Sequence, residues 1–281
     1  MFDLAALHAE LAGTIFAGNF HFSPVTDSTN SDALEAGRAG APHGSVYFAD
    51  EQLAGRGRGD HAWHSAAGEG LYVSVLLRPK MPASRVHLLP LAAGLAAAGA
   101  IRTVSGLKVD LRWPNDLLLD SNSGARKVGG ILTESKIEDD RVAFAVVGVG
   151  INVHQRTFAP GLSTPATSLD LDAGRRISRQ PLLVSLLKSL ERETIALLNP
   201  TESQAIPMRM TQASTWVRGR QVEVHGPQAC SGVTAGLDEH GFLLVRTTDG
   251  LVTVKTGGIR AATCGGADAF GAGDQAAGIP P

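Results

Sequence analysis

Residues 107–153 read LKVDLRWPNDLLLDSNSGARKVGGILTESKIEDDRVAFAVVGVGINV, and this stretch decides the fold class. Its runs LKVDLRW, DLLLD, KVGGILTESKI and RVAFAVVGVGINV are rich in Val, Ile and Leu. Such runs predict four β-strands, and DSNSGAR between the second and the third has the composition of a turn. The centre of the chain is therefore expected to be a β-sheet.

Helical and strand patterns alternate on both sides of this stretch. Leu4, Leu7 and Leu11 recur at helical spacing, and NFHFSPV, SVYFAD and GLYVSVLLR predict further strands. Residues 84–103 predict a buried helix and residues 181–198 an amphipathic one, with a second helix continuing to Trp216 and an irregular connection at 155–178. The predicted fold class is α/β, in an α+β arrangement.

The pattern changes after Trp216. RQVEVHG, CSGVTAGLDEHG, FLLVRTTDG and LVTVKTGGI predict short strands separated by Gly and Asp turns, which is typical of a small β-barrel. We therefore expect a first domain at residues 1–217 and a second at 218–262. Residues 263–281 are small and glycine-rich, so a disordered tail is expected.

Composition excludes several classes of protein. The 281 residues hold 25 Lys and Arg against 27 Asp and Glu, a net charge of −2 that gives no general attraction to nucleic acid or to anionic membranes. Cys230 and Cys264 are too few for a disulfide framework, and the N-terminus lacks a basic leader. No uninterrupted apolar stretch approaches the length of a membrane span. A soluble cytoplasmic protein is expected.

A glycine-rich loop with two arginines follows the SVYFAD strand. In QLAGRGRG, residues 52–59, glycines let backbone amides approach a ligand, while Arg56 and Arg58 offer planar cations suited to phosphate. This pattern indicates an anion-binding loop. Glycine-arginine stretches also occur in nucleic-acid binders and in flexible turns, so these alternatives stay open.

Asn115 and Asp116 end the RWPND motif at residues 112–116. Asn115 can hydrogen-bond a nucleotide, and Asp116 can hold Mg²⁺, which accepts one carboxylate together with substrate phosphates. The alternative is a hairpin turn with Trp113 in the core.

Lys127 opens KVGGIL, where Gly129 and Gly130 permit close approach of a ligand. This lysine can grip a carboxylate and can stabilise the negative charge that grows on phosphate oxygens when such a carboxylate attacks a phosphorus atom. An exposed lysine entering a strand is the alternative. GVGIN at 148–152 and DSTN at 27–30 are further candidates, although the first is also a plain strand end and the second a helix cap.

The motifs DSTN, QLAGRGRG, WPND, KVGGIL and GVGIN resemble, in this order, those of the biotin protein ligases, or biotin–acetyl-CoA-carboxylase ligases, over about residues 23–260. The resemblance implies a mixed-sheet catalytic domain related to class II synthetases, followed by an SH3-like barrel. It implies that biotin and ATP, with Mg²⁺, give biotinyl-5'-AMP and pyrophosphate. Biotin then passes to a lysine of the biotin carboxyl carrier protein of acetyl-CoA carboxylase or a related carboxylase.

The resemblance also implies roles for individual residues. The catalytic residues would be Lys127, Arg56 and Arg58, and the metal ligand Asp116. The biotin site would comprise Ser28, Thr29, Gln52, Gly55, Arg56, Arg58, Lys127, Gly130 and Gly148. The ATP site would comprise Arg58, Trp63, Asn115 and Asn152.

Two features depart from the best-known bacterial pattern. Gly59, Asp60 and His61 replace a more basic run, so phosphate contacts there stay open, with His61 as a partial substitute. About 22 residues precede the first motif, from which we expect a monofunctional ligase without a DNA-binding domain.

Other functions remain open. Lipoate ligases and octanoyl transferases resemble the same fold, and a biotin binder without turnover is a further alternative. The sequence leaves the particular carrier, and the choice between monomer and homodimer, open.

Overall fold

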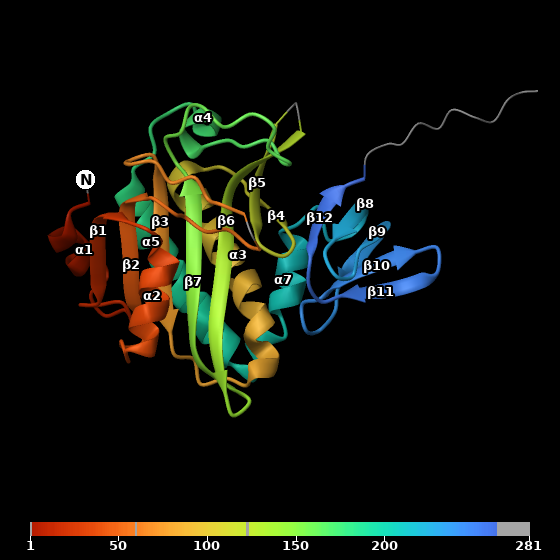
Figure 1. Cartoon of the computed structure of the whole chain (residues 1–281), viewed down its shortest axis with the longest axis horizontal. Helices are drawn as coiled ribbons and strands as arrows, with labels where there is room; N and C mark the ends of the chain where they lie inside the picture. Colours follow the sequence, from red (N-terminus) through yellow and green to blue (C-terminus); the bar gives the residue numbers. More distant parts are fainter. Residues whose placement is uncertain (1, 60, 122–123, 263–281) are drawn as a thin grey trace, which may run out of the picture.

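The computed structural model describes residues 2–59, 61–121 and 124–262. A seven-stranded mixed sheet of order β1-β2-β3-β7-β6-β5-β4 forms its centre (Figure 1). β1 and β2 pair in parallel, and the other five pairs are antiparallel. The strands are β1 (Phe20–Thr26), β2 (Ser45–Gln52), β3 (Gly70–Leu77), β4 (Asp110–Arg112), β5 (Asp116–Ser121), β6 (Gly124–Glu138) and β7 (Arg141–Asn152). The four central strands expected from residues 107–153 are thus confirmed.

Helices cover both faces of this sheet (Figure 1). α2 (Thr29–Arg38) packs on one face, and α3 (Leu89–Ser105) packs on the other face beneath α5 (Arg179–Leu198). The remaining elements of this part are α1 (Leu4–Glu10), the 3₁₀-helix η1 (Ala83–Leu88), α4 (Leu169–Ala173), α6 (Pro200–Ser203) and α7 (Ile206–Gln212). The expectation of one helix continuing to Trp216 is wrong, because α6 and α7 each begin anew at a proline in the first turn.

Alternation along β3 separates the two faces. Val73, Val75 and Leu77 join the large core beneath α3, whereas Leu76 packs toward α2. Ser74 shares the α2 side and is fully buried. A buried hydroxyl needs hydrogen-bond partners. Other polar side chains must therefore lie beside Ser74 on this face of the sheet, near the start of α2.

The segment Ala83–Ser105, comprising η1 and α3, is long and apolar enough to cross a membrane by length and composition. This segment contains the buried helix that was expected at residues 84–103. More than half of its most apolar window is buried inside the protein, where α3 packs between the sheet and α5. The core helix of a soluble protein has the same composition, so this segment is consistent with a soluble protein.

A second sheet of five antiparallel strands follows, in the order β11-β10-β9-β8-β12. Its strands are β8 (Arg218–His225), β9 (Cys230–Leu237), β10 (Leu243–Thr247), β11 (Gly250–Val254) and β12 (Gly258–Ala261). In the described part of the chain β11 and β12 are its two edges, so the pairings do not close a barrel. The C-terminal part is β-rich, as expected.

The expectation of one strand across LVTVKTGGI is wrong. The chain leaves β11 after Val254 and re-enters the sheet as β12 at Gly258. Between them Gly257 has a φ of +131° and lies against the His225 carbonyl, a conformation and an approach that only glycine allows. The expected disorder of residues 263–281 lies outside the described residues.

Candidate active site

A cavity of about 790 Å³ opens on the α2 side of the large sheet and extends to the C-terminal sheet. Twelve of the thirteen candidate residues line it: Ser28, Thr29, Gln52, Arg56, Arg58, Trp63, Asn115, Asp116, Lys127, Gly130, Gly148 and Asn152. Gly55 is the exception, and Asp60 lies outside the described residues. Segments far apart in the sequence therefore meet in one site.

Glycines form the floor of the cavity. Strand register places Ser74 of β3 opposite Gly148 of β7, and Gly150 of β7 opposite Gly130 of β6. A Cβ on Gly148 would lie 2.1 Å from the Asn30 Oδ1 atom, and one on Gly150 would lie 2.7 Å from the Trp63 indole. Gly148 was expected to make room directly for a ligand. It instead makes room for the side chain of Asn30.

The start of α2 supplies the polar end of the cavity. The Gln52 Oε1 atom accepts hydrogen bonds from the Thr29 backbone N–H and, at 3.1 Å, from its hydroxyl. The Thr29 and Ser74 hydroxyl oxygens lie 2.8 Å apart. Ser28 occupies the N-cap position, yet its side chain makes no capping hydrogen bond. Its hydroxyl therefore remains free for a ligand at a helix N-terminus.

The glycine-rich loop folds back on itself as an irregular hairpin. Isolated antiparallel bridges join Gln52 to Ser65 and Arg56 to Ala62. A Cβ on Gly55 would lie 2.4 Å from the Trp63 carbonyl oxygen, and the Gly55 carbonyl accepts the Trp63 N–H. Gly55 accordingly closes the loop and does not face the cavity.

Lys127 and Asp116 meet across β6 and β5. The Lys127 Nζ atom lies 2.6 Å from Asp116 Oδ1, and Arg112 donates two hydrogen bonds to Asp116 Oδ2. The ammonium also lies 5.5 Å from the centre of the Trp63 ring, within cation–π range. One partly buried carboxylate therefore holds two cations in place beside the cavity.

The same contacts bear on metal binding. Both oxygens of Asp116 already face cations, and no cluster of three or more acidic, His or Cys side chains occurs within residues 2–59, 61–121 and 124–262. The residues present do not fit a magnesium ion held directly by Asp116.

We expect Asp116→Asn to lower the free energy of unfolding at pH 7 by about 2 kcal/mol, since two cations lose their shared anion. Burial raises the pKa of Asp116, but the charges and hydrogen bonds of Lys127 and Arg112 together lower this pKa below its usual range. The carboxylate therefore contributes stability above the usual aspartate pKa of about 3.9 and loses this contribution as pH falls further.

Urea unfolding across a pH series measures this effect, and the deficit of the variant should shrink below about pH 4. Asp120→Asn, at an exposed carboxylate on the same strand, is the control and should change little. A deficit that stayed constant with pH would contradict the assignment.

The two loop arginines have different partners. Arg56 forms an ion pair with Glu134 of β6 at 2.6 Å. Arg58 donates to the Gly257 carbonyl and, at 3.1 Å, to the Thr256 hydroxyl in the turn between β11 and β12. Burial lowers the pKa of Arg58, and the nearby Asp116 carboxylate opposes this shift. The turn between β11 and β12 of the C-terminal sheet thus contacts the glycine-rich loop directly.

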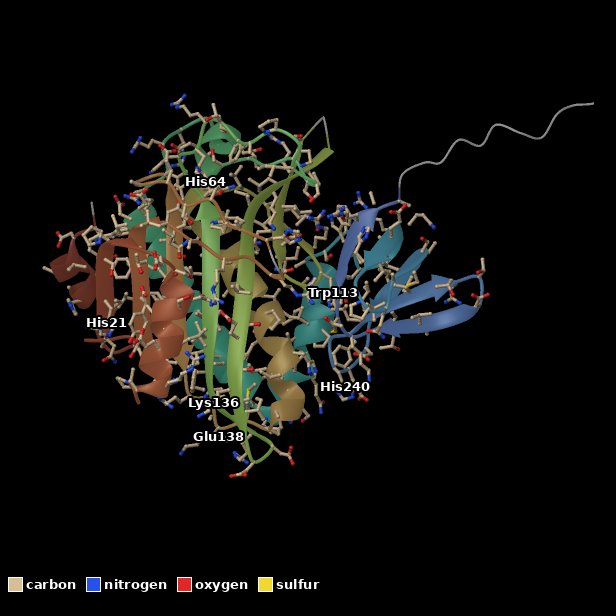
Figure 2. The ribbon with its side chains drawn as sticks, viewed as in Figure 1. His21, His64, Trp113, Lys136, Glu138 and His240 are labelled. Atoms are coloured by element: carbon tan, nitrogen blue, oxygen red, sulfur yellow. The ribbon has the colours of Figure 1, made fainter. Side chains whose placement is uncertain are left out.

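Asn115 and Asn152 use their amide nitrogens within the protein. Asn115 Nδ2 donates to the Ile131 carbonyl at 2.9 Å, and Asn152 Nδ2 donates to the Thr167 carbonyl at 3.0 Å. Trp113, as the alternative reading of WPND expected, is buried, and its indole N–H donates to the Gly241 carbonyl (Figure 2). The motif thus combines a core tryptophan with cavity-lining polar residues.

Sequence reasoning missed several residues of the site. Asn30 stands in DSTN but received no role of its own, and Ser74 was passed over although it interrupts the apolar run LYVSVLL. That interruption was the available signal. The sequence holds no comparable signal for Glu134 or for the turn that contains Thr256. Their partners, Arg56 and Arg58, lie 78 and 198 residues away in the sequence.

The fold and the site define a class of protein. The sequence model of the Biotin/lipoate A/B protein ligase family matches residues 22–152. The biotin protein ligase of Aquifex aeolicus, solved in complex with biotin and ATP, has a similar structure, with a TM-score of 0.72 and 27% identity over 86% of this chain and 98% of that one.

Two relatives narrow the class. The Bifunctional ligase/repressor BirA of Bacillus subtilis (strain 168) is 33% identical over 250 residues, covering 85% of this chain and 72% of the relative. The Biotin--[acetyl-CoA-carboxylase] ligase of Mycobacterium tuberculosis is 34% identical over 241 residues, covering 83% and 85%. The chain belongs to the biotin protein ligase family.

Proposed function

We propose that this protein activates biotin with ATP to biotinyl-5'-AMP and pyrophosphate and then transfers biotin to a lysine of a biotin carboxyl carrier protein. The observation that carries the proposal is the single cavity itself. It joins a neutral hydrogen-bonding end, formed by Thr29 and Gln52, to a cationic part that contains Lys127, Arg56 and Arg58. The ureido ring of biotin is neutral and its valerate end is anionic, so the two parts match the two ends of the substrate.

The first step forms the acyl-adenylate. A biotin carboxylate oxygen attacks the α-phosphorus of ATP, the new P–O bond forms, and the bond to the β-phosphate oxygen breaks to release pyrophosphate. Negative charge grows on the α-phosphate oxygens during this attack. Lys127, fixed by Asp116 at 2.6 Å, presents a cation that needs no reorganisation to stabilise that charge, and Arg56 and Arg58 add two more.

The second step needs no nucleophile from the enzyme. The neutral amine of the carrier lysine attacks the acyl carbon of the mixed anhydride, the C–N bond forms, the bond from that carbon to the phosphate oxygen breaks to release AMP, and the nitrogen gives up one proton to solvent. Holding the adenylate in the cavity while the carrier docks accelerates the transfer, because proximity replaces a bimolecular encounter. The cavity is open to solvent over part of its extent, which leaves a path for the lysine.

We infer that Mg²⁺ enters as a complex with the ATP phosphates and that Asp116 positions Lys127 and Arg112. Magnesium keeps several waters and prefers substrate phosphates to a cage of protein ligands. This preference supports a metal ion that is held by ATP and not by Asp116. The proposed roles of Asn115, Asn152 and Trp63 at the nucleotide rest on their place in the cavity lining. The indole N–H of Trp63 is buried and has no hydrogen-bond partner among the described residues, which supports a role as a donor to the adenylate.

We further propose that residues 1–217 form the catalytic domain and residues 218–262 an SH3-like domain, since β8 begins at Arg218. Five short antiparallel strands support this assignment. The near-neutral charge supports the absence of a nucleic-acid or membrane partner, and the low number of cysteines supports a cytoplasmic location.

The test is incubation of the full chain with biotin, ATP, Mg²⁺ and a biotin carboxyl carrier domain. We expect pyrophosphate release that depends on biotin and a gain of one biotinyl mass on the carrier. Replacing the acceptor lysine of the carrier by arginine should abolish the mass gain and leave adenylate formation intact. An unmodified carrier in the complete mixture would refute transfer.

The same assay separates biotin from the acids of the related ligases. Pyrophosphate release should be supported by biotin and not by lipoate or octanoate. The opposite preference would overturn the substrate assignment while leaving the reaction type in place.

A further inference from the structure

Glu134 lies behind the cavity and holds one of its cations. Its Oε2 atom accepts from the Arg56 guanidinium at 2.6 Å and from the Asn30 amide at 2.9 Å. Glu134 is not among the residues that line the cavity, whereas Arg56 and Asn30 are. In the described part of the chain, the side-chain contacts that join this carboxylate to the cavity therefore run through these two residues.

The two routes lead to different ends of the cavity. Asn30 is buried, accepts from the Ser74 hydroxyl at 2.6 Å, and through Ser74 reaches Thr29 at the polar end. Arg56 stands in the glycine-rich loop on the cationic side. A change in Glu134 that acted through Asn30 would alter the binding of a neutral ring, and a change that acted through Arg56 would alter the stabilisation of phosphate charge.

The ion pair between Glu134 and Arg56 has a counterpart in the site, the ion pair between Asp116 and Lys127. Lys127 and Arg56 are both held at 2.6 Å by a carboxylate on the same sheet, Asp116 from β5 and Glu134 from β6. A loop arginine has many rotamers, and ordering it costs side-chain entropy at each turnover unless a partner fixes it beforehand. Because the Glu134 side chain is largely covered and also accepts from a buried amide, it is better fixed than a carboxylate on the open surface.

We propose that Glu134 is a positioning residue for adenylate formation, which fixes Arg56 toward the reacting phosphate. The inference rests on the proposed function. It predicts a loss in kcat with little change in the KM for biotin, because Arg56 acts on charge that develops during the reaction.

The decisive variant is Glu134→Gln, whose amide oxygen can still accept from Asn30 but whose charge is lost. In the full chain we expect kcat for biotin-dependent pyrophosphate release to fall about tenfold, with the KM for biotin within about twofold of wild type. Glu134→Asp keeps the charge and should restore kcat to within about threefold. Thermal melting of both variants verifies that the chain remains folded.

A matched control lies on the same strand. Glu138 pairs with Lys136 at 2.6 Å near the far end of the β6–β7 hairpin, where both side chains are exposed (Figure 2). Glu138→Gln should leave both kinetic constants unchanged. This comparison separates the loss of an ion pair at the site from the loss of an ion pair elsewhere on β6.

A double-mutant cycle completes the test. If Glu134 acts through Arg56, Arg56→Gln and the double variant Arg56→Gln/Glu134→Gln should have the same kcat. Additive losses, an unchanged kcat in Glu134→Gln, or a loss confined to the KM for biotin would each overturn the inference. If the wild-type protein is active, any of these results leaves the proposed function standing. A wild-type protein that releases no pyrophosphate with biotin would overturn both the role of Glu134 and the proposed function.

Discussion

Lys127→Ala should lower the rate of biotin-dependent pyrophosphate release by about a thousandfold, the largest kinetic effect we expect from a single substitution. The variant removes a fixed cation from the place where phosphate charge develops. The hydrogen bonds among Thr29, Gln52 and Ser74 are untouched, so biotin should still bind. A coupled pyrophosphate assay measures the first quantity and isothermal titration calorimetry the second.

Two controls accompany this variant. Lys136→Ala removes an exposed lysine of the same strand whose partner is Glu138, and it should retain full activity. Lys127→Arg keeps the charge in a bulkier planar group and should restore only part of the rate. Asp116 keeps its bonds to Arg112 in the alanine variant, so the fold should survive. Activity of Lys127→Ala within about tenfold of wild type would remove this lysine from the mechanism.

Gly148→Ala should have the largest combined effect on stability and binding. The added Cβ would lie 2.1 Å from Asn30 Oδ1 and 3.2 Å from the Leu132 carbonyl oxygen, so the Asn30 side chain must move. Moving it breaks the bond from Ser74 and the bond to Glu134. We expect the free energy of unfolding to fall by about 3 kcal/mol, from overpacking together with unsatisfied buried polar groups.

Biotin affinity should fall about a hundredfold in the same variant, because the polar end of the cavity loses its arrangement. Chemical unfolding and calorimetry measure the two effects. Gly99→Ala is the matched control: this glycine lies inside α3, an added Cβ would have the Ser189 Oγ atom at 4.0 Å as its nearest contact outside the helix's own backbone, and a gain of about 0.5 to 1 kcal/mol is expected. Unchanged biotin affinity in Gly148→Ala would show that Asn30 does not organise the site.

Much of the fold was predictable because its signals are local. The apolar runs of residues 107–153 became β4 to β7, and the helices α1 and α5 followed their apolar spacing. Errors occurred where the chain interrupts a regular pattern. The break between β11 and β12 depends on the approach of Gly257 to the His225 carbonyl, a contact between segments 32 residues apart (257 − 225).

The sequence predicted which residues form the candidate site but not which partners their side chains contact. The motifs, together with the family resemblance, identified twelve residues that line one cavity. Their partners were not deducible, since a side chain's neighbours across a sheet depend on register. A register shift between Leu117 and Leu118 in the pairing of β5 with β6 illustrates this for Asp116 and Lys127. Asp116 consequently contacts two cations, whereas the WPND motif had suggested a metal ligand.

The sequence by itself determined the class of fold and the family, because strand alternation, helical spacing and the order of five motifs are properties of the chain read in one dimension. Only the tertiary structure decided which carboxylate fixes which cation, that Gly148 makes room for Asn30, and that Arg58 contacts the turn at Thr256 and Gly257. The reason is physical: these contacts join residues from 11 to 199 positions apart, and loop closure, strand register and burial together fix their distances.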